Sequence, residues 1–260
     1  MASVACNDRQ EAEARRLEER SLNASGPFQS LLYDGWLLGY RRGPTKRLRC
    51  VNPFYASTLA LAEKVDYCSR FYASVGLPTI FRMLPFSRPA ELDSWLERAD
   101  WEPFERTMVQ RTALDEVRLP PSAAADVAIM PVADWQEPAS RILQIAPELL
   151  PQHVERARLH PLPHAGALLR HDGEVVACGL AKIEGDHAGL FAITTVESGR
   201  GRGYGRAIVA ALLSEAMRQG ARIAYLQVTS SNVAALALYR RFGFTTAYEY
   251  WYRGKPGEHA

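Results

Sequence analysis

Apolar residues alternate, or recur at helical spacing, most clearly in the second half of the chain. Apolar runs at residues 191–196 and 223–228 predict two strands. The segment 206–219 between them predicts a helix with one buried face, formed by Val209, Leu212, Leu213, Ala216 and Met217. A second helix is expected at 234–242. Strands that alternate with helices in this way predict an α/β fold, in which a central mixed sheet is flanked by helices.

The segments just upstream predict a hairpin and two polar helices. Asp172-Gly173 is a dipeptide typical of tight hairpin turns, and apolar strand-like segments flank it on both sides. The expected elements are an opening strand, two helices and the two hairpin strands, at 126–131, 133–144, 146–159, 167–170 and 174–184.

The first half of the chain repeats this order of elements at a constant offset of 143 residues. Trp101 and Phe244 both close a helix-turn-strand junction. The offset then aligns four pairs of segments with the same predicted secondary structure, although few residues are identical: 33–40 with 176–183, 62–77 with 205–220, 80–83 with 223–226, and 91–99 with 234–242. A segment rich in proline and alanine at 119–125 is typical of a linker. We therefore expect two α/β domains, residues 1–119 and 120–260, each with a twisted mixed sheet flanked by helices.

A glycine-rich turn between the strand at 191–196 and the helix at 206–219 predicts an anion site. The backbone amides at the start of a helix have no intrahelical partner, and the helix dipole adds about half a positive charge there. Glycines let the backbone approach a phosphate or pyrophosphate closely, and arginines add charge around it. The turn has both, in the order Arg200, Gly201, Arg202, Gly203, Tyr204, Gly205 and Arg206.

Two common phosphate motifs do not fit this turn. A Walker loop requires Lys-Ser or Lys-Thr after the turn, and no such pair follows it. A Rossmann fingerprint requires a third glycine where Arg206 stands and a carboxylate on the next strand, which carries Gln227 instead. The sequence therefore excludes a nucleotide triphosphatase and disfavours a dinucleotide-binding enzyme.

The turn does fit the pattern Arg-x-x-Gly-x-Gly, and the residues downstream extend it. A strand, the segment Asn-x-x-Ala-x-x-Leu-Tyr at 232–239, and Gly243-Phe244 follow in order. Together these motifs resemble the GNAT superfamily of acyl-coenzyme A N-acyltransferases, over residues 167–252. The resemblance implies a GNAT fold, with acetyl-coenzyme A (acetyl-CoA) as co-substrate and transfer of its acetyl group to an amine. Within the superfamily, residues 224–244 resemble the bacterial ribosomal-protein alanine acetyltransferases.

The resemblance also implies where the co-substrate lies. The strand backbone at Ile193, Thr194 and Thr195 would pair with the pantetheine arm, and the turn at 200–206 would hold the pyrophosphate. Asn232 is similar to the asparagine of the family that hydrogen-bonds the co-substrate. The same residue could instead cap the helix that follows it, and both roles remain open.

Tyr239 is the candidate catalytic residue. Attack by an amine on the thioester expels a thiolate whose ordinary pKa is about 8.5, so a proton supplied to sulfur assists the reaction. A phenol at this helix position can act as that general acid, and a core tyrosine is the alternative.

The sequence does not identify a general base. The ribosomal-protein enzymes have a glutamate where this chain has Gln227, and an amide cannot accept a proton at neutral pH. This departure weakens the case for a ribosomal-protein substrate. An acceptor amine that arrives already neutral would need no strong base; otherwise the remaining candidates are Glu184, Asp186, His187, Glu197 and Glu249.

The aligned residues of the first half lack the anion site. The offset places Ser57, Ala60 and Ala62 opposite Arg200, Gly203 and Gly205 of the turn, and Leu96 opposite the candidate tyrosine. The first domain is therefore expected not to bind acetyl-CoA, so that the chain binds one molecule. It would act as structural support, or it would supply one wall of the acceptor pocket, for which the candidates are Trp36, Tyr40, Arg41 and Arg42.

Composition and charge indicate which partners and which cellular location to expect. The chain has 260 residues, 47% of them hydrophobic, which is enough for a full core, and a formal net charge of +2. So small a charge gives no reason to expect nucleic acid or a membrane as a partner. The N-terminal 20 residues lack the apolar segment of a signal peptide, and no apolar stretch is long enough to span a membrane. A soluble cytoplasmic protein is expected, and a homodimer is left open.

The cysteines and histidines predict no metal site. Cys6, Cys50, Cys68 and Cys178 lie far apart without a Cys-x-x-Cys pair, which favours reduced thiols over disulfides or zinc. Three histidines in the second polar helix region lack metal-ligand spacing and are expected at the surface; these are His153, His160 and His164.

The sequence leaves three candidate functions. The first is an acetyl-CoA-dependent N-acetyltransferase that acts on a primary amine of a small molecule or on an amino-terminal group. The second is a non-catalytic acyl-CoA-binding sensor, against which the retained Tyr239 argues, and the third is the disfavoured dinucleotide enzyme. The acceptor itself cannot be predicted, because the segments around 133–164 that would border it carry no transferable code.

Overall fold

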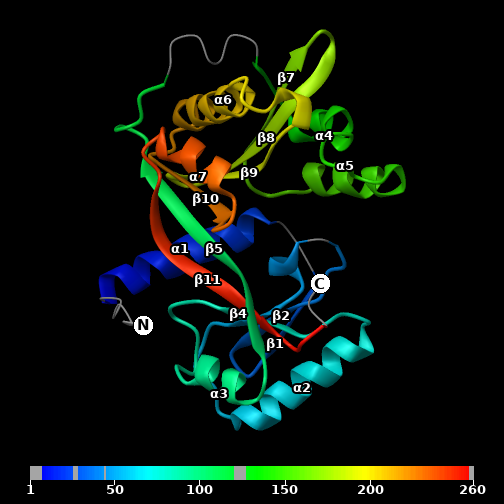
Figure 1. Cartoon of the computed structure of the whole chain (residues 1–260), viewed down its shortest axis with the longest axis vertical. Coiled ribbons are helices and arrows are strands. Elements are labelled where there is room, and N and C mark those ends of the chain that lie inside the picture. The colour runs from blue at the N-terminus through cyan, green and yellow to red at the C-terminus, as the bar shows by residue number, and fades with distance from the viewer. Residues whose placement is uncertain (1–7, 26–28, 44, 120–126, 258–260) are drawn as a thin grey trace.

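The computed structural model describes residues 8–25, 29–43, 45–119 and 127–257, and all of the strands in these ranges form one mixed sheet (Figure 1). The sheet has eleven strands in the order β1-β2-β3-β4-β11-β5-β10-β9-β8-β7-β6. The first half of the chain contains α1 (Asp8–Ala24), β1 (Ser30–Tyr33), β2 (Trp36–Gly39), η1 (Lys46–Leu48), β3 (Val51–Pro53), α2 (Leu61–Ser74), β4 (Ile80–Met83), α3 (Leu92–Arg98) and β5 (Glu102–Ala113).

The second half has the elements that its apolar pattern predicted. In chain order they are β6 (Val127–Met130), α4 (Val132–Ser140), η2 (Pro147–Leu149), α5 (Leu150–Arg158), β7 (His164–His171), β8 (Glu174–Glu184), β9 (His187–Thr195), η3 (Glu197–Gly199), α6 (Tyr204–Arg218), β10 (Ile223–Thr229), α7 (Val233–Arg240) and β11 (Thr245–Gly254). The predicted α/β class, with helices packed on a mixed sheet, is confirmed.

The two polar helices are shorter than their sequence pattern predicted. The first ends at Ser140 rather than near residue 144, where Gln144 adopts a left-handed φ of 53° that a helix does not continue through. The second begins as the 3₁₀ turn η2, with Pro147 in its first turn, and becomes α-helical only from Leu150. The predicted linker at 119–125 lies, except for Leu119, outside the described residues.

Each half of the chain contributes its last strand to the centre of the shared sheet. β5, from the first half, lies between β10 and β11 and is antiparallel to both. β11, from the second half, lies between β4 and β5, so that the two long strands run side by side along the long axis of the molecule (Figure 1). The halves are therefore joined by continuous backbone hydrogen bonding and not only by packed side chains.

A buried ion pair joins α1 to this central region. Glu18 and Arg82 form a two-point salt bridge, with the second contact, Arg82 Nη2 to Glu18 Oε2, at 3.0 Å. Tyr248 of β11 donates its hydroxyl proton to Glu18 Oε2 at 2.6 Å, and the guanidinium lies 3.8 Å from the centre of the Tyr250 ring. Because all of these side chains are at most 6% exposed, the pair links elements of both halves in a water-poor environment.

Helices cover the two faces of the second-half sheet at close range. On one face α6 packs so near β8 that a Cβ added to Gly179 would lie 2.6 Å from Ile208. On the other face the Trp135 ring of α4 would lie 2.3 Å from a Cβ at Gly166 of β7. Gly166 is paired with Leu180 and Ala167 with Gly179, so successive residues of β8 alternate between the α6 face and the α4/α5 face.

None of the described helices is both long and apolar enough to cross a membrane.

Candidate active site

Strands β9 and β10 separate at the place where the sequence expected a ligand. They pair in parallel only from His187 with Ile223 to Leu190 with Leu226. Beyond this point β9 remains paired to β8, and β10 to β5, but the two strands no longer pair with each other in the described chain. The β9 edge at Ile193, Thr194 and Thr195 therefore presents backbone groups that an extended ligand could pair with. A bulge at Ala192, with φ of 52°, falls within this edge.

The glycine turn directly follows this free edge and starts α6. Gly201 and Gly203 have φ values of 78° and 86°, in the left-handed region that favours glycine, and Gly203 is the N-cap of α6. The first backbone bond into the helix is from Ala207 N to Gly203 O, at 3.0 Å. Within the described residues the amides of Tyr204, Gly205 and Arg206 thus have no backbone partner, which is the arrangement expected of an anion site.

The charged side chains of the turn are exposed. Arg200 lies 3.7 Å from Glu197, and Arg202 donates to the Tyr204 hydroxyl at 3.4 Å. Neither contact is tight, and the guanidinium groups remain accessible to an anion.

Gly205 is where the three predicted parts of the site meet. A Cβ at this position would lie 3.4 Å from Thr195 Oγ1, at the end of β9, and 3.4 Å from Leu238 Cδ2, on α7. The strand edge, the turn and the helix that carries Tyr239 are therefore neighbours in space, as the motif order predicted.

Tyr239 is buried on the inner side of α7. It is 7% exposed, and its ring centre lies 5.9 Å from that of Phe244. Burial raises the pKa of its phenol to about 12, so the hydroxyl is protonated at neutral pH and can donate a proton.

Asn232 caps α7. Its side-chain oxygen accepts a hydrogen bond from the Ala235 amide at 3.1 Å. Of the two roles that the sequence left open, the helix cap is present in the structure, and contact with a co-substrate stays a prediction.

Gln227 lies just beyond the point where β9 and β10 separate, in a polar network that the sequence did not predict. Its side-chain oxygen accepts hydrogen bonds from Arg47 and, at 2.9 Å, from the Tyr250 hydroxyl. Its amide nitrogen donates to Ser21 of α1 at 2.5 Å. Two of these three partners come from the first half of the chain, about 200 residues away in sequence, which is why motif spacing could not find them.

Each candidate base contacts a polar or charged side chain. Glu184 accepts from Asn23 at 3.0 Å, and Glu249 pairs with Arg106 at 2.9 Å. Asp186 lies 2.6 Å from His187, whose imidazole lowers the pKa of that carboxyl. The exposed Glu197 faces Arg200.

The three histidines expected at the surface lie around a cavity of about 160 Å³ on the α4/α5 face. All three are half-buried because α5 and the segment after it pack against the sheet. The other residues that line this cavity are Ser25, Arg41, Val132, Gln136, Arg156, Ala157, Leu180 and Lys182. No group of His, Cys, Asp and Glu side chains in the described ranges is arranged to hold a metal ion.

Of the four proposed wall residues from the first half, only Arg41 reaches this cavity. Trp36 is fully buried in the first-half core, where its indole donates to Arg88 O at 2.9 Å. Tyr40 packs on Phe71, and Arg42 donates to Val75 O.

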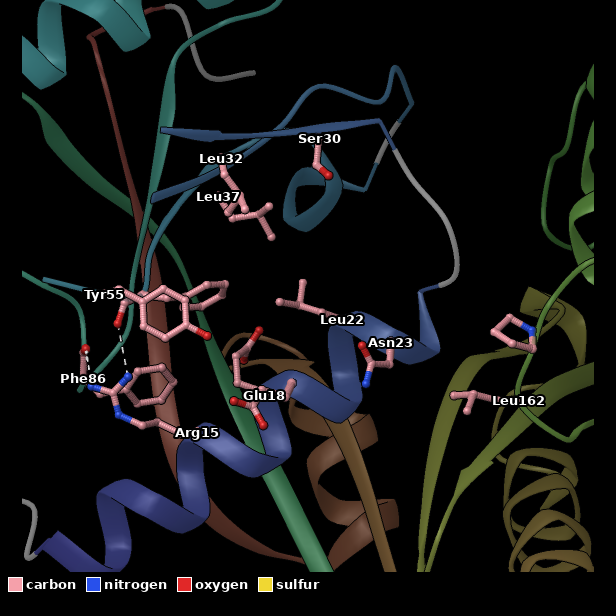
Figure 2. Close-up of a pocket in the computed structure, with 13 residues that line it drawn as sticks. Arg15, Glu18, Leu22, Asn23, Ser30, Leu32, Leu37, Tyr55, Phe86 and Leu162 are labelled. Carbon is pink, nitrogen blue, oxygen red and sulfur yellow. Dashed lines mark hydrogen bonds between the residues drawn. The ribbon is translucent and has the colours of Figure 1, made fainter. Parts of the chain in front are cut away.

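A larger cavity of about 840 Å³ lies between α1 and the sheet of the first half (Figure 2). Arg15 and Glu18 of α1 lie on one side of it and Leu32 and Leu37 on the other, while Leu162 approaches from the second half. None of the predicted site residues lines this cavity.

The segment before α2, which the 143-residue offset aligned with the turn, holds a side chain of the protein itself. The Asp34 carboxylate accepts hydrogen bonds from the backbone amides of Thr58 and Leu59, each at 3.0 Å, and from the Thr58 hydroxyl at 2.7 Å. These bonds and Lys64 hold the pKa of that carboxyl well below its usual range. Thr58 and Leu59 precede α2 at the positions that lie 143 residues before Gly201 and Arg202.

Comparison with known proteins identifies the family. Residues 130–244 match the model of the acetyltransferase (GNAT) family. The chain is 30% identical over 246 residues to an N-acetyltransferase of Bacillus subtilis, YobR, whose function is uncharacterized, and the match covers 91% of this chain and 97% of that protein. A shorter match of 34% identity over 79 residues, 30% of this chain and 53% of the other, links it to the ribosomal protein bS18 alanine N-acetyltransferase of Escherichia coli.

The fold is also similar to that of a solved N-acetyltransferase. A GCN5-related N-acetyltransferase from Kribbella flavida superposes with a TM-score of 0.71 at 20% identity, covering 95% of this chain and 96% of that one. The chain belongs to the GNAT family of acetyltransferases. It is an acyltransferase whose co-substrate is acetyl-CoA, and the free amides of the turn suit the pyrophosphate of that molecule.

Proposed function

We propose that this protein transfers the acetyl group of acetyl-CoA to a primary amine, either of a small molecule or at an amino terminus. The observation that carries the proposal is the meeting of three features around Gly205: the unpaired β9 edge, the anion-binding start of α6, and α7 with a protonated Tyr239. A strand edge, an anion site and an acid are what transfer from a phosphate-bearing thioester requires.

In the proposed mechanism acetyl-CoA supplies the activated acetyl group, and the chain positions the reactants and moves protons. The backbone at Ile193, Thr194 and Thr195 aligns the thioester, and the turn at 200–206 fixes its phosphate end, with Asn232 as a further contact. The amine nitrogen forms a bond to the acetyl carbon, and the carbon–sulfur bond breaks with its electron pair on sulfur. The nitrogen loses one proton to water as the amide forms. Tyr239 donates its hydroxyl proton to the sulfur and regains a proton from solvent.

Electrostatics around Gln227 favour an acceptor amine that is already neutral. Arg47 contacts Gln227, and its charge also reaches Lys182, so this face of the sheet is positive. Positive surroundings lower the pKa of an ammonium group, which then loses its proton to water without a dedicated base. This accounts for the glutamine where related enzymes have a glutamate.

We also infer that residues 1–119 and 120–260 are two GNAT-like units that have exchanged their last strands. The supporting observation is the constant offset: α2 and α6 begin 143 residues apart, and so do β5 and β11. The Asp34 carboxylate on the first-half amides then argues for a single acetyl-CoA per chain, bound in the second half.

Release of free thiol from acetyl-CoA, corrected for hydrolysis and measured with a panel of amines, tests the proposed function. Replacement of Tyr239 by Phe should lower kcat by about 10²- to 10⁴-fold, because the acid is removed while the ring remains. The matched control is Tyr72→Phe, which removes a buried phenol that donates to Gly39 O in the first half and should leave kcat unchanged.

Full turnover by the Tyr239→Phe variant would show that this tyrosine is not the acid. Tight binding of acetyl-CoA without turnover on any amine would instead favour an acyl-CoA-binding sensor, the alternative that the sequence left open.

A further inference from the structure

The cavity on the α4/α5 face is strongly basic; we call it the basic pocket. Its cations are Arg41 from the first half, Arg156 of α5 and Lys182 of β8. No carboxylate lines it among the residues that the structure describes. Three positive groups in one small cavity repel one another. In the free protein their charge is not neutralised, and a bound anion would neutralise it.

Lys182 is the centre of this charge. Its ammonium group has no salt bridge or hydrogen bond to any residue of the described chain, and it is half-buried. The charges that act on it most, Arg156 and Arg47, are both positive. A half-buried lysine in a strand is usually paired with an acid, and its lack of one points to a ligand that supplies the negative charge.

Gln136 provides independent evidence for a ligand. Its side chain is only 8% exposed and lines the basic pocket, and its oxygen has no hydrogen-bond partner in the described structure. Buried polar atoms of this kind are rarely left unpaired, so a polar group is expected to fill the space beside it.

Two histidines with defined hydrogen bonds complete a polar wall of the basic pocket. His160 Nε2 lies 3.2 Å from Ala24 O, and its Nδ1 accepts from the Leu162 amide at 3.2 Å, so both of its nitrogens are in use. His164 Nδ1 donates to Leu162 O at 2.7 Å, which leaves Nε2 as the nitrogen available to a ligand.

The basic pocket adjoins the point where β9 and β10 separate. Leu180, which lines the pocket, is paired with Phe191, the first β9 residue beyond the pairing with β10. Lys182 and Leu180 face α4 and α5, whereas the glycine turn starts α6 on the other face of the sheet. The pocket is therefore distinct from the anion site of the turn but next to the expected thioester position.

We propose that the basic pocket binds an anionic group of the acceptor, and that the acceptor is a small primary amine carrying a carboxylate, as a free amino acid does. This inference rests on the proposed acetyl transfer. Lys182, Arg156 and Arg41 bind the anion, and the amine extends from it toward the thioester. The cavity of about 160 Å³ is well below the roughly 300–1,000 Å³ of pockets for drug-sized ligands, so it accommodates one end of a small molecule.

Paired acceptors test this proposal. Glycine, β-alanine and longer ω-amino acids are compared with their carboxamides, and 2-aminoethylphosphonate is added to distinguish a carboxylate from a phosphate-like anion. We expect kcat/KM to favour the anionic member of each pair by about 30-fold or more. The phosphonate arm reports which anion the pocket prefers. Equal or better activity with the amides or with polyamines, in an active enzyme, overturns the proposal and leaves the acetyl transfer intact.

Substitution of Lys182 separates recognition from folding. Lys182→Met should raise KM for the amino acid by about 30-fold or more, leave KM for the amide unchanged, and leave the melting temperature unchanged or higher. Lys182→Arg should retain most of the preference. Arg70→Met removes an exposed α2 cation as the control and should change neither KM. A drop in melting temperature together with equal KM changes for acid and amide would mean that Lys182 is structural, and would overturn the proposal.

A binding measurement tests the pocket even if no amine is acetylated. The ligand is a hydroxy acid of the same chain length as the preferred amino acid, with a hydroxyl in place of the amine. It is titrated into the acetyl-CoA-free protein, and binding is measured by calorimetry. Binding that is lost in Lys182→Met supports the anion site independently of turnover. No binding to the wild-type protein, or equal binding to both proteins, overturns it.

Discussion

Lys182 is the side chain on which the proposed binding of the acceptor depends most. It occupies a position on β8 that faces α4 and α5, two residues after Leu180 and four after Cys178, both of which are buried. Burial, followed by the nearby Arg156 and Arg47, lowers the pKa of its ammonium group to about 8. The sequence contained a signal for this residue, since a lysine interrupts an otherwise apolar strand face.

The lowered pKa predicts how ligand binding depends on pH. Loss of the Lys182 charge leaves only the two arginines of the basic pocket, so binding of the hydroxy acid should be constant well below pH 8 and weaken as the pH rises from 7 to 9, by up to about tenfold. In Lys182→Arg the guanidinium stays charged, and the affinity should be flat across this range. Calorimetric titrations at pH 7, 8 and 9 measure both. An unchanged wild-type affinity at pH 9 would contradict the assignment.

The lowered pKa of Lys182 also determines how the stability of the fold depends on pH. The folded pKa of Lys182 lies below the value of about 10.4 in an unfolded chain, so the unfolded state binds the proton more tightly. The resulting destabilisation is complete below pH 8 and absent above about pH 10.4.

At the residue scale the sequence indicates candidate site residues only where they lie close together along the chain. Tyr239 and the glycine turn lie within one segment of about 40 residues, and their order placed them together. Gln136, Arg41 and Lys182 meet only because α4, the segment after β2, and β8 fold onto one another. No spacing in the chain encodes that meeting, nor does it show that the three half-buried histidines line the same cavity.

Helix α6 gains its proposed binding function from its first turn alone. The rest of the helix is core: Ile208, Val209, Leu212, Leu213 and Ala216 are all fully buried. This separation lets the first turn be altered without emptying the core.

Gly203→Ala tests the first turn. An alanine at φ of 86° costs about 1–2 kcal/mol of stability and moves the amides at the start of α6, so affinity for coenzyme A should fall about tenfold or more. Gly173→Ala is the matched control, because its φ of 82° imposes the same strain in the hairpin turn between β7 and β8. Both variants should lose similar stability in thermal unfolding, and only the first should lose affinity. An equal effect on affinity would show that strain and not the anion site is responsible.

At the level of elements, the apolar pattern located the helices and strands of the second half and misjudged some of their ends. Proline and a left-handed glutamine shortened the two polar helices, and these are local events that periodicity averages over. The pairing of β5 between β10 and β11 was not predicted, since strand order depends on contacts between residues more than 100 positions apart.

The whole molecule depends on β5 and β11, the two long strands at the centre of the shared sheet. Because the sheet is continuous through these strands, neither half contains all of the strands that complete its own part of the sheet. Unfolding should therefore be a single cooperative transition.

Glu18→Gln tests this coupling at the buried pair with Arg82. Loss of the carboxylate leaves the guanidinium uncompensated between the halves and should lower the free energy of unfolding by about 3–5 kcal/mol, measured in urea. Asp66→Asn, which removes the acid of an exposed pair on α2, should cost no more than about 0.5 kcal/mol. Similar losses in the two variants, or two separate transitions in either, would contradict a shared core.

Asp34 gives the first half a built-in substitute for a phosphate. Because this carboxylate belongs to the same chain, its effective concentration at the amides of Thr58 and Leu59 is far above that of any dissolved competitor. Under the proposed function, one polypeptide contains a helix start whose preceding amides always bind its own carboxylate and a second helix start that binds acetyl-CoA reversibly. The amide-to-oxygen distances of 3.0 Å in the first are an internal reference against which the geometry of the second can be compared once a ligand is bound.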